Sequence, residues 1–153
     1  MNEPIYLTQQ TRENLIQHLV NFEENQDEVI NDYFPHLNQE RLDFTEKVNQ
    51  YKKSLEELLQ HVEIAVKDSD SFPLVIIGSK VTIRDLDNQE TYVYCISDPS
   101  LDSFCFSDVS YISPVGKALL LKKVGDRVTV NTPAGQFKYE ILNIYYGENI
   151  TQK

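Results

Sequence analysis

Acidic side chains are the residues of this sequence whose type and spacing could support chemistry. Glu40 and Asp43 are three positions apart, so in a helix they would lie on one face. Asp32 precedes them and could approach them if the chain turned back in between. Carboxylate oxygens suit hard cations such as Mg²⁺, which makes these three residues candidates for assisting a metal ion. The alternative is a solvated acidic surface, because such pairs are common on the exposed helices of acidic proteins.

Other catalytic patterns are missing from the sequence. His18, His36 and His61 are too widely spaced to form one site, and neither a Gly-rich phosphate loop nor a recognisable Ser or Cys nucleophile occurs. Cys95 and Cys105 are too few for a disulfide framework or a four-ligand zinc site. We expect them to be reduced thiols, and we expect neither an enzyme nor a metal site of the protein's own.

The negative charge is concentrated in the first half of the chain. Residues 1–70 carry fifteen acidic and six basic side chains, whereas residues 71–153 carry nine and eight, and the net charge is −10. Phosphate backbones would repel the acidic half, so we expect no direct nucleic-acid binding through it. It could instead face a basic protein surface, hold a divalent cation, or be a solvated helical face. No apolar run is long enough for a bilayer and no signal-type segment opens the sequence, so we expect a cytoplasmic protein without membrane contact.

The sequence changes character near residues 68–73. No Gly occurs before that stretch, whereas all five Gly and four of the six Pro occur from residue 73 onward. This shift predicts a helical module, a short linker and a β-rich module.

Two heptad stripes occupy the helical module. Their apolar members alternate at spacings of four and three, with Gln26 filling one position: Leu15, Leu19, Phe22, Val29 and Tyr33, then Phe44, Val48, Tyr51, Leu55, Leu58, Val62 and Ala65. Thr8 and Asn38 are suitable helix caps, and Pro35 interrupts the pattern between the stripes. Two such helices can bury their stripes in an antiparallel hairpin. An intermolecular coiled-coil dimer is the alternative, but the interruption around Pro35 favours the hairpin.

The second half reads as short strands with one helix. Apolar, β-branched and aromatic residues mark segments 74–77, 80–83, 91–96, 108–112, 128–130 and 137–145. Ser113 and Pro114 are typical of a helix start. The sequence therefore predicts an α+β protein, with an antiparallel two-helix coiled-coil hairpin over residues 1–70 and a small antiparallel β domain with one short helix over residues 71–153.

Four segments in order carry a family resemblance. They are Ile77-Gly78-Ser79-Lys80-Val81, Ile112 to Leu120, Val124-Gly125-Asp126-Arg127-Val128 and Thr132-Pro133-Ala134-Gly135. Together they resemble the C-terminal domain of the Gre transcript-cleavage and elongation factors, which implies an FKBP-like fold for this half. The hairpin resembles the family in architecture alone.

The resemblance implies a partner and a binding site. In Gre factors the loop with the Ser-Pro pair docks on bacterial RNA polymerase, at the rim of its secondary channel. Ser113 and Pro114 are therefore the expected partner-binding residues, although Ile112 stands where the family usually has a polar or acidic residue. We expect a monomer that meets nucleic acid only through the polymerase complex.

The hairpin tip departs from the family. Gre factors carry two tip acids, in a motif like Asp-Leu-x-Glu-Asn-Ala-Glu-Tyr, that help hold the polymerase's second catalytic magnesium ion. Residues 32–43 contain no such motif, and the arms are shorter. The resemblance thus implies a secondary-channel regulator of elongation without a cofactor of its own. Alternatives are a cleavage stimulator in which Glu40, Asp43 and Asp32 share the polymerase's Mg²⁺, an Rnk-type polymerase-binding regulator and, last, a prolyl isomerase.

Overall fold

The computed structural model describes residues 5–68, 71–98 and 108–146. Its fold is α+β, as predicted, and the chain divides into two compact units, Met1–Asp68 and Ser69–Lys153. In the described part of the chain, neither long helix has the apolar stretch that crossing a bilayer would require.

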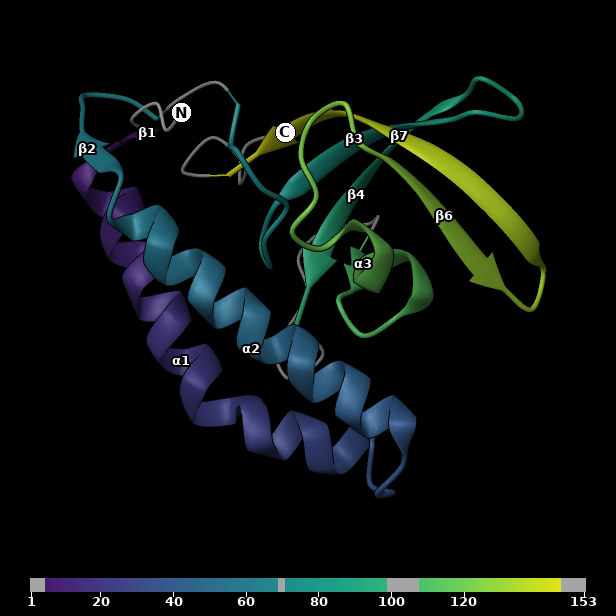
Figure 1. The fold of residues 1–153 in the computed structure, drawn as a ribbon. Coiled ribbons are helices and arrows are strands. Elements are labelled where there is room, and N and C mark those ends of the chain that lie inside the picture. The colour runs from purple at the N-terminus through teal and green to yellow at the C-terminus, as the bar shows by residue number, and fades with distance from the viewer. Residues whose placement is uncertain (1–4, 69–70, 99–107, 147–153) are drawn as a thin grey trace. The chain divides into compact units, whose positions relative to one another are not determined.

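The first unit is a helical hairpin (Figure 1). Helix α1 spans Gln9–Tyr33 and helix α2 spans Gln39–Leu59. Both predicted N-caps are confirmed: the Thr8 hydroxyl accepts a hydrogen bond from the Thr11 amide, and the Asn38 side chain accepts one from the Arg41 amide, each at 3.1 Å. These bonds satisfy amides that the first helical turn would leave without partners. At 1.5 Å per residue, α1 is roughly 40 Å long.

The apolar stripes form the seam between the helices as far as the last turn of α1. Within the seam, His18, Phe22 and Tyr51 form one cluster of rings, with His18 Nε2 2.8 Å from the Tyr51 hydroxyl. At the end of α1 the prediction was wrong, because Tyr33 is 48% exposed while Phe34 is buried and stacks on a ring of α2. A straight helix has 3.6 residues per turn, so a strict 3.5-residue stripe drifts off the contact face.

A small sheet closes the opposite end of the hairpin, and the sequence did not reveal it. Strand β1, Ile5–Leu7, pairs in parallel with β2, Val62–Ile64. The second stripe was predicted to continue in helical form to Val62 and Ala65, but α2 ends at Leu59. The chain after β2 is fixed by Asp68, whose carboxylate accepts hydrogen bonds from the Thr8 amide at 2.8 Å and the Thr11 hydroxyl at 2.9 Å. The segment is thereby tied to the start of α1.

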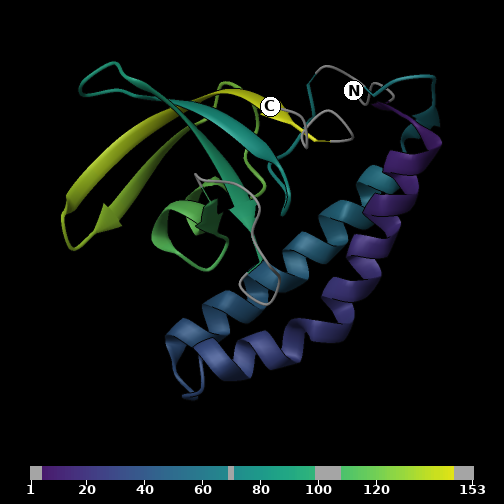
Figure 2. The same cartoon turned by 180° about the vertical axis from the view of Figure 1, so that it is seen from behind.

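The second unit contains a curled five-stranded sheet, visible from both sides in Figures 1 and 2. Its strands are β3 Lys80–Asp85, β4 Thr91–Ser97, β5 Asp108–Ser110, β6 Arg127–Thr132 and β7 Gly135–Tyr145, in the spatial order β5-β4-β3-β7-β6. All neighbours are antiparallel except β4 and β5, which are parallel. The predicted antiparallel sheet is therefore a mixed one. Parallel pairing needs a connection longer than a hairpin turn, which the interval between Ser97 and Asp108 provides.

Helix α3, Pro114–Leu119, contacts β5 and β6. Its Leu119 and the inward residues of the strands, such as Val81, Ile83 and Ile141, are almost completely buried. The predicted strand over residues 74–77 is absent: Val75 exchanges backbone hydrogen bonds with Leu121 and Lys122, but the next amide, of Ile76, donates to the Ser79 hydroxyl at 2.9 Å. This segment still supplies buried apolar side chains to the core.

The expectation of reduced thiols was wrong for Cys95, which is disulfide-bonded in the structure. Cys105 lies outside the described residues. Two cysteines are too few for a framework of several disulfides, but the cysteine count alone could not exclude a single disulfide bond.

Candidate functional site

The three tip acids lie at the end of the hairpin and do not form a metal-binding group. Asp32 is in the last turn of α1, and Glu40 and Asp43 are in the first turns of α2; all three are exposed. Asp43 accepts a hydrogen bond from Gln39 at 2.8 Å. Within the described residues, no group of three or more His, Cys, Asp or Glu side chains could hold a metal ion. These residues therefore do not fit a magnesium site of their own, and the role predicted for them stays a prediction.

Arg41 joins the two helices at this end. Its guanidinium donates to the backbone carbonyl of Phe34 and to the side chain of Asn31, both at 3.0 Å. The Phe34 carbonyl lies at the C-terminal end of α1, where carbonyls have no helical partner and a cation is favourable. Arg41 thus fixes the geometry of the turn.

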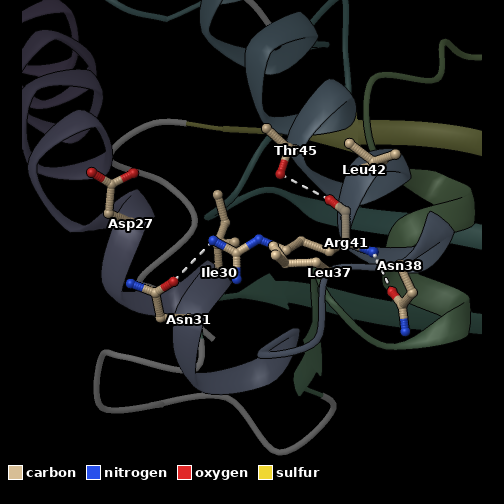
Figure 3. Close-up of a pocket in the computed structure, with 8 residues that line it drawn as sticks. All are labelled: Asp27, Ile30, Asn31, Leu37, Asn38, Arg41, Leu42 and Thr45. Atoms are coloured by element: carbon tan, nitrogen blue, oxygen red, sulfur yellow. Dashed lines mark hydrogen bonds between the residues drawn. The ribbon is translucent and has the colours of Figure 1, made fainter.

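A groove opens beside this arginine, and the search for catalytic residues missed it (Figure 3). It has a volume of about 490 Å³ and is lined by both helices and the turn: Asp27, Ile30, Asn31, Leu37, Asn38, Arg41, Leu42 and Thr45. We call it the tip groove. Leu37 and Leu42 fall outside the heptad stripes. Their position in the sequence could have indicated the groove, because an apolar residue outside the heptad stripe has no place in the seam.

In the second unit, the Ser113-Pro114 pair forms the start of α3. The Ser113 hydroxyl donates to the Ser110 carbonyl at 2.7 Å and accepts from the Gly116 amide at 3.1 Å. Ser113 is therefore occupied in capping the helix, whereas Pro114, at its first position, is exposed. Of the two residues, Pro114 presents its side chain to solvent and Ser113 positions it. Their predicted docking role remains a prediction.

Gly116 allows this turn to close. A Cβ atom on Gly116 would lie 1.9 Å from the Ser110 carbonyl oxygen and 2.9 Å from the Tyr111 Cα. Any side chain would therefore collide with the backbone of the preceding strand. The close approach therefore requires glycine at this position.

Comparison with known proteins identifies the second unit. Residues 70–146 match the family described as "Transcription elongation factor, GreA/GreB, C-term". Among curated proteins, the chain is 39% identical over 83 residues to transcription elongation factor GreA of Acinetobacter baumannii, covering 54% of this chain and 52% of that protein. It is 40% identical over 92 residues to the GreA of Beijerinckia indica, covering 60% and 59%. The chain thus spans about half the length of the curated relatives it matches.

Two solved structures are similar along most of the chain. One is the prokaryotic transcription elongation factor GreA/GreB from Nitrosomonas europaea, with a TM-score of 0.48, 22% identity, and coverage of 93% of this chain and 99% of that one. The other is GreA factor homolog 1 from Thermus thermophilus, with a TM-score of 0.42, 22% identity, and coverage of 94% and 99%. Since the family match spans residues 70–146, half of the chain, this protein belongs to the GreA/GreB family.

Proposed function

We propose that this protein binds bacterial RNA polymerase in the cytoplasm and regulates transcription elongation. It acts as a monomer, with the second unit docked at the rim of the secondary channel and the hairpin entering the channel. The observation that carries the proposal is the match of residues 70–146 to the C-terminal domain of the GreA/GreB family, whose curated relatives are named transcription elongation factors. The protein is an accessory factor, and the polymerase supplies the active site.

Pro114 is the docking residue we expect to matter most. It is exposed at the first position of α3, and its side chain is held there by the Ser113 cap beneath it. A proline at this position lacks an amide that the helix would not use, so alanine can replace it without removing a backbone hydrogen bond. Pro133 is an exposed turn proline of the same unit and offers a matched control.

Binding of the full chain to core RNA polymerase tests the proposal. The wild-type protein should be retained by immobilised polymerase at micromolar concentrations. Pro114→Ala should weaken this retention severalfold, while Pro133→Ala should leave it unchanged. If the wild-type chain shows no association at micromolar concentrations, the proposal is wrong.

The hairpin tip supports a protein that regulates elongation without stimulating transcript cleavage. The tip acids are exposed and form no metal-binding group, and residues 32–43 lack the acidic motif of cleavage factors. In stalled elongation complexes, the wild-type protein should alter RNA extension and leave the RNA uncut. If it stimulates cleavage, and Glu40→Ala with Asp43→Ala abolishes the effect, the cleavage alternative replaces this proposal.

A further inference from the structure

The end of the hairpin exposes large apolar side chains. Leu37 in the turn is 91% exposed, Leu42 on α2 is 64% exposed, and Tyr33 at the end of α1 is 48% exposed. Leu37 and Leu42 line the tip groove, and the nearly buried Ile30 also lines it. Figure 3 shows Ile30 from α1, Leu37 from the turn and Leu42 from α2 among the residues that line the groove. Apolar groups gathered at one hollow favour contact with another apolar group.

The same region is strongly acidic. Residues 23–46, which we call the acidic end, contain eight Asp and Glu residues and one basic residue, Arg41. Arg41 is bound to the Phe34 carbonyl and the Asn31 side chain, so its charge is directed into the turn. The surface around the groove therefore attracts cationic groups.

This charge restricts what could occupy the groove. Nucleic acid is repelled by the acidic end. A second copy of this chain would bring like charges together. A metal ion would lack a set of ligands, since no cluster of three acids, histidines or cysteines occurs in the described ranges. A protein segment that combines apolar and basic side chains satisfies both the groove and its charge.

We infer that the tip groove binds a protein segment carrying an apolar side chain flanked by Lys or Arg. The inference rests on the proposed function, because we assign the segment to the RNA polymerase surface that the hairpin meets. The apolar side chain enters between Leu37 and Leu42, and its basic neighbours face the acidic end. The tip thus acts as a docking surface that anchors the arm in place of a metal-binding motif.

Substitution of the two leucines tests the apolar part. Both are more than half exposed, so Leu37→Ser with Leu42→Ser should leave the hairpin folded, which circular dichroism will verify. Val20→Ser is the matched control, because Val20 is an exposed apolar residue of α1 outside the groove, at 41% exposure. We expect the double variant to raise the Kd for core polymerase about tenfold, the loss typical of a buried interface anchor. Val20→Ser should leave the Kd unchanged.

Salt dependence and crosslinking test the basic part. Asp32→Asn with Glu40→Gln should make binding less sensitive to salt, because two attractive charges are lost. A photo-crosslinking amino acid at position 37 should capture a Lys- or Arg-containing polymerase peptide. Capture of RNA or of an acidic peptide would overturn the inference.

The results separate this inference from the proposed function. If wild-type protein binds polymerase and the double leucine variant binds equally well, the inference fails and the proposed function stands. If wild-type protein does not bind polymerase, the proposed function fails and the inference fails with it.

Discussion

Replacing Gly116 with alanine should have two opposing effects on stability, a gain in helix propensity and a steric clash. On propensity alone, Gly116→Ala would stabilise α3 by about 1 kcal/mol. The added Cβ, however, would lie 1.9 Å from the Ser110 carbonyl oxygen, whereas ordinary contacts begin at 3.4 Å. The two backbone segments would have to separate by about 1.5 Å.

The Ser110 carbonyl cannot move freely to make this space. It accepts hydrogen bonds from the Ser113 hydroxyl at 2.7 Å and from the Ser113 amide at 3.0 Å. Overpacking typically costs about 1–3 kcal/mol, and weakening these two bonds adds about 1 kcal/mol each. After the gain in propensity, we expect Gly116→Ala to lower the free energy of unfolding of the second unit by about 3 kcal/mol.

Urea unfolding followed by near-ultraviolet circular dichroism of the tyrosines measures this difference. Gly125→Ala is the control, because nothing lies within 4 Å of its added Cβ but its φ is +93°. That variant should lose about 1–2 kcal/mol from backbone strain alone. The reasoning is refuted if Gly116→Ala is as stable as the wild-type protein, or less destabilised than Gly125→Ala.

Three further substitutions probe stability elsewhere. The Gln26 side-chain oxygen is buried in the hairpin without a hydrogen-bond partner. Gln26→Leu should therefore raise the free energy of unfolding in urea by about 1 kcal/mol. As a control, Gln17→Leu at an exposed position should leave it nearly unchanged. Asp68→Ala removes the carboxylate that binds the start of α1 and leaves the buried Thr11 hydroxyl without that acceptor, so thermal unfolding should show a loss of about 2–3 kcal/mol. Burial raises the pKa of Tyr139 from 10.0 to about 12, so the folded state retains a proton that the unfolded state loses. The stabilisation from neutral Tyr139 is complete below pH 10, and about 2 kcal/mol of the free energy of unfolding should be lost by pH 12. In Tyr139→Phe the free energy of unfolding should fall less steeply between pH 10 and about 12. An unchanged fall would contradict the raised pKa of Tyr139.

The sequence revealed those elements whose causes are local. Thr8, Asn38 and Ser113 were identified as caps because a hydroxyl or amide oxygen next to a helical pattern has one obvious use, and the structure confirms all three. The strands from residue 80 onward follow from alternation and turn residues close to them. In each case the deciding interaction lies within a few residues.

Features that depend on distant contacts could not be predicted. Strand β2 forms because Val62–Ile64 meets Ile5–Leu7, far away in the sequence, and locally its residues continue the heptad stripe. The tip acids share a helix face by their spacing, as predicted, but whether Asp32 joined them depended on the geometry of the turn. Arg41 holds that geometry through hydrogen bonds to residues seven and ten positions earlier, across the turn, which no pattern of spacing indicates.

Each segment that carries the resemblance contains or adjoins a turn held by one of its own side chains. The Ser79 hydroxyl, the Ser113 hydroxyl, the Asp126 carboxylate and the Thr132 hydroxyl each accept a hydrogen bond from a backbone amide two or three residues away, at 2.9 to 3.1 Å. Sequence identity with relatives at these positions therefore indicates a shared fold of the second unit. Residues 32–43 hold their own turn through Asn38 and Arg41, but most of their side chains are exposed and free to differ between relatives. Two members of this family can therefore share the fold of the second unit and differ in residues 32–43, so exchanging this segment between them should leave the urea unfolding of the second unit unchanged.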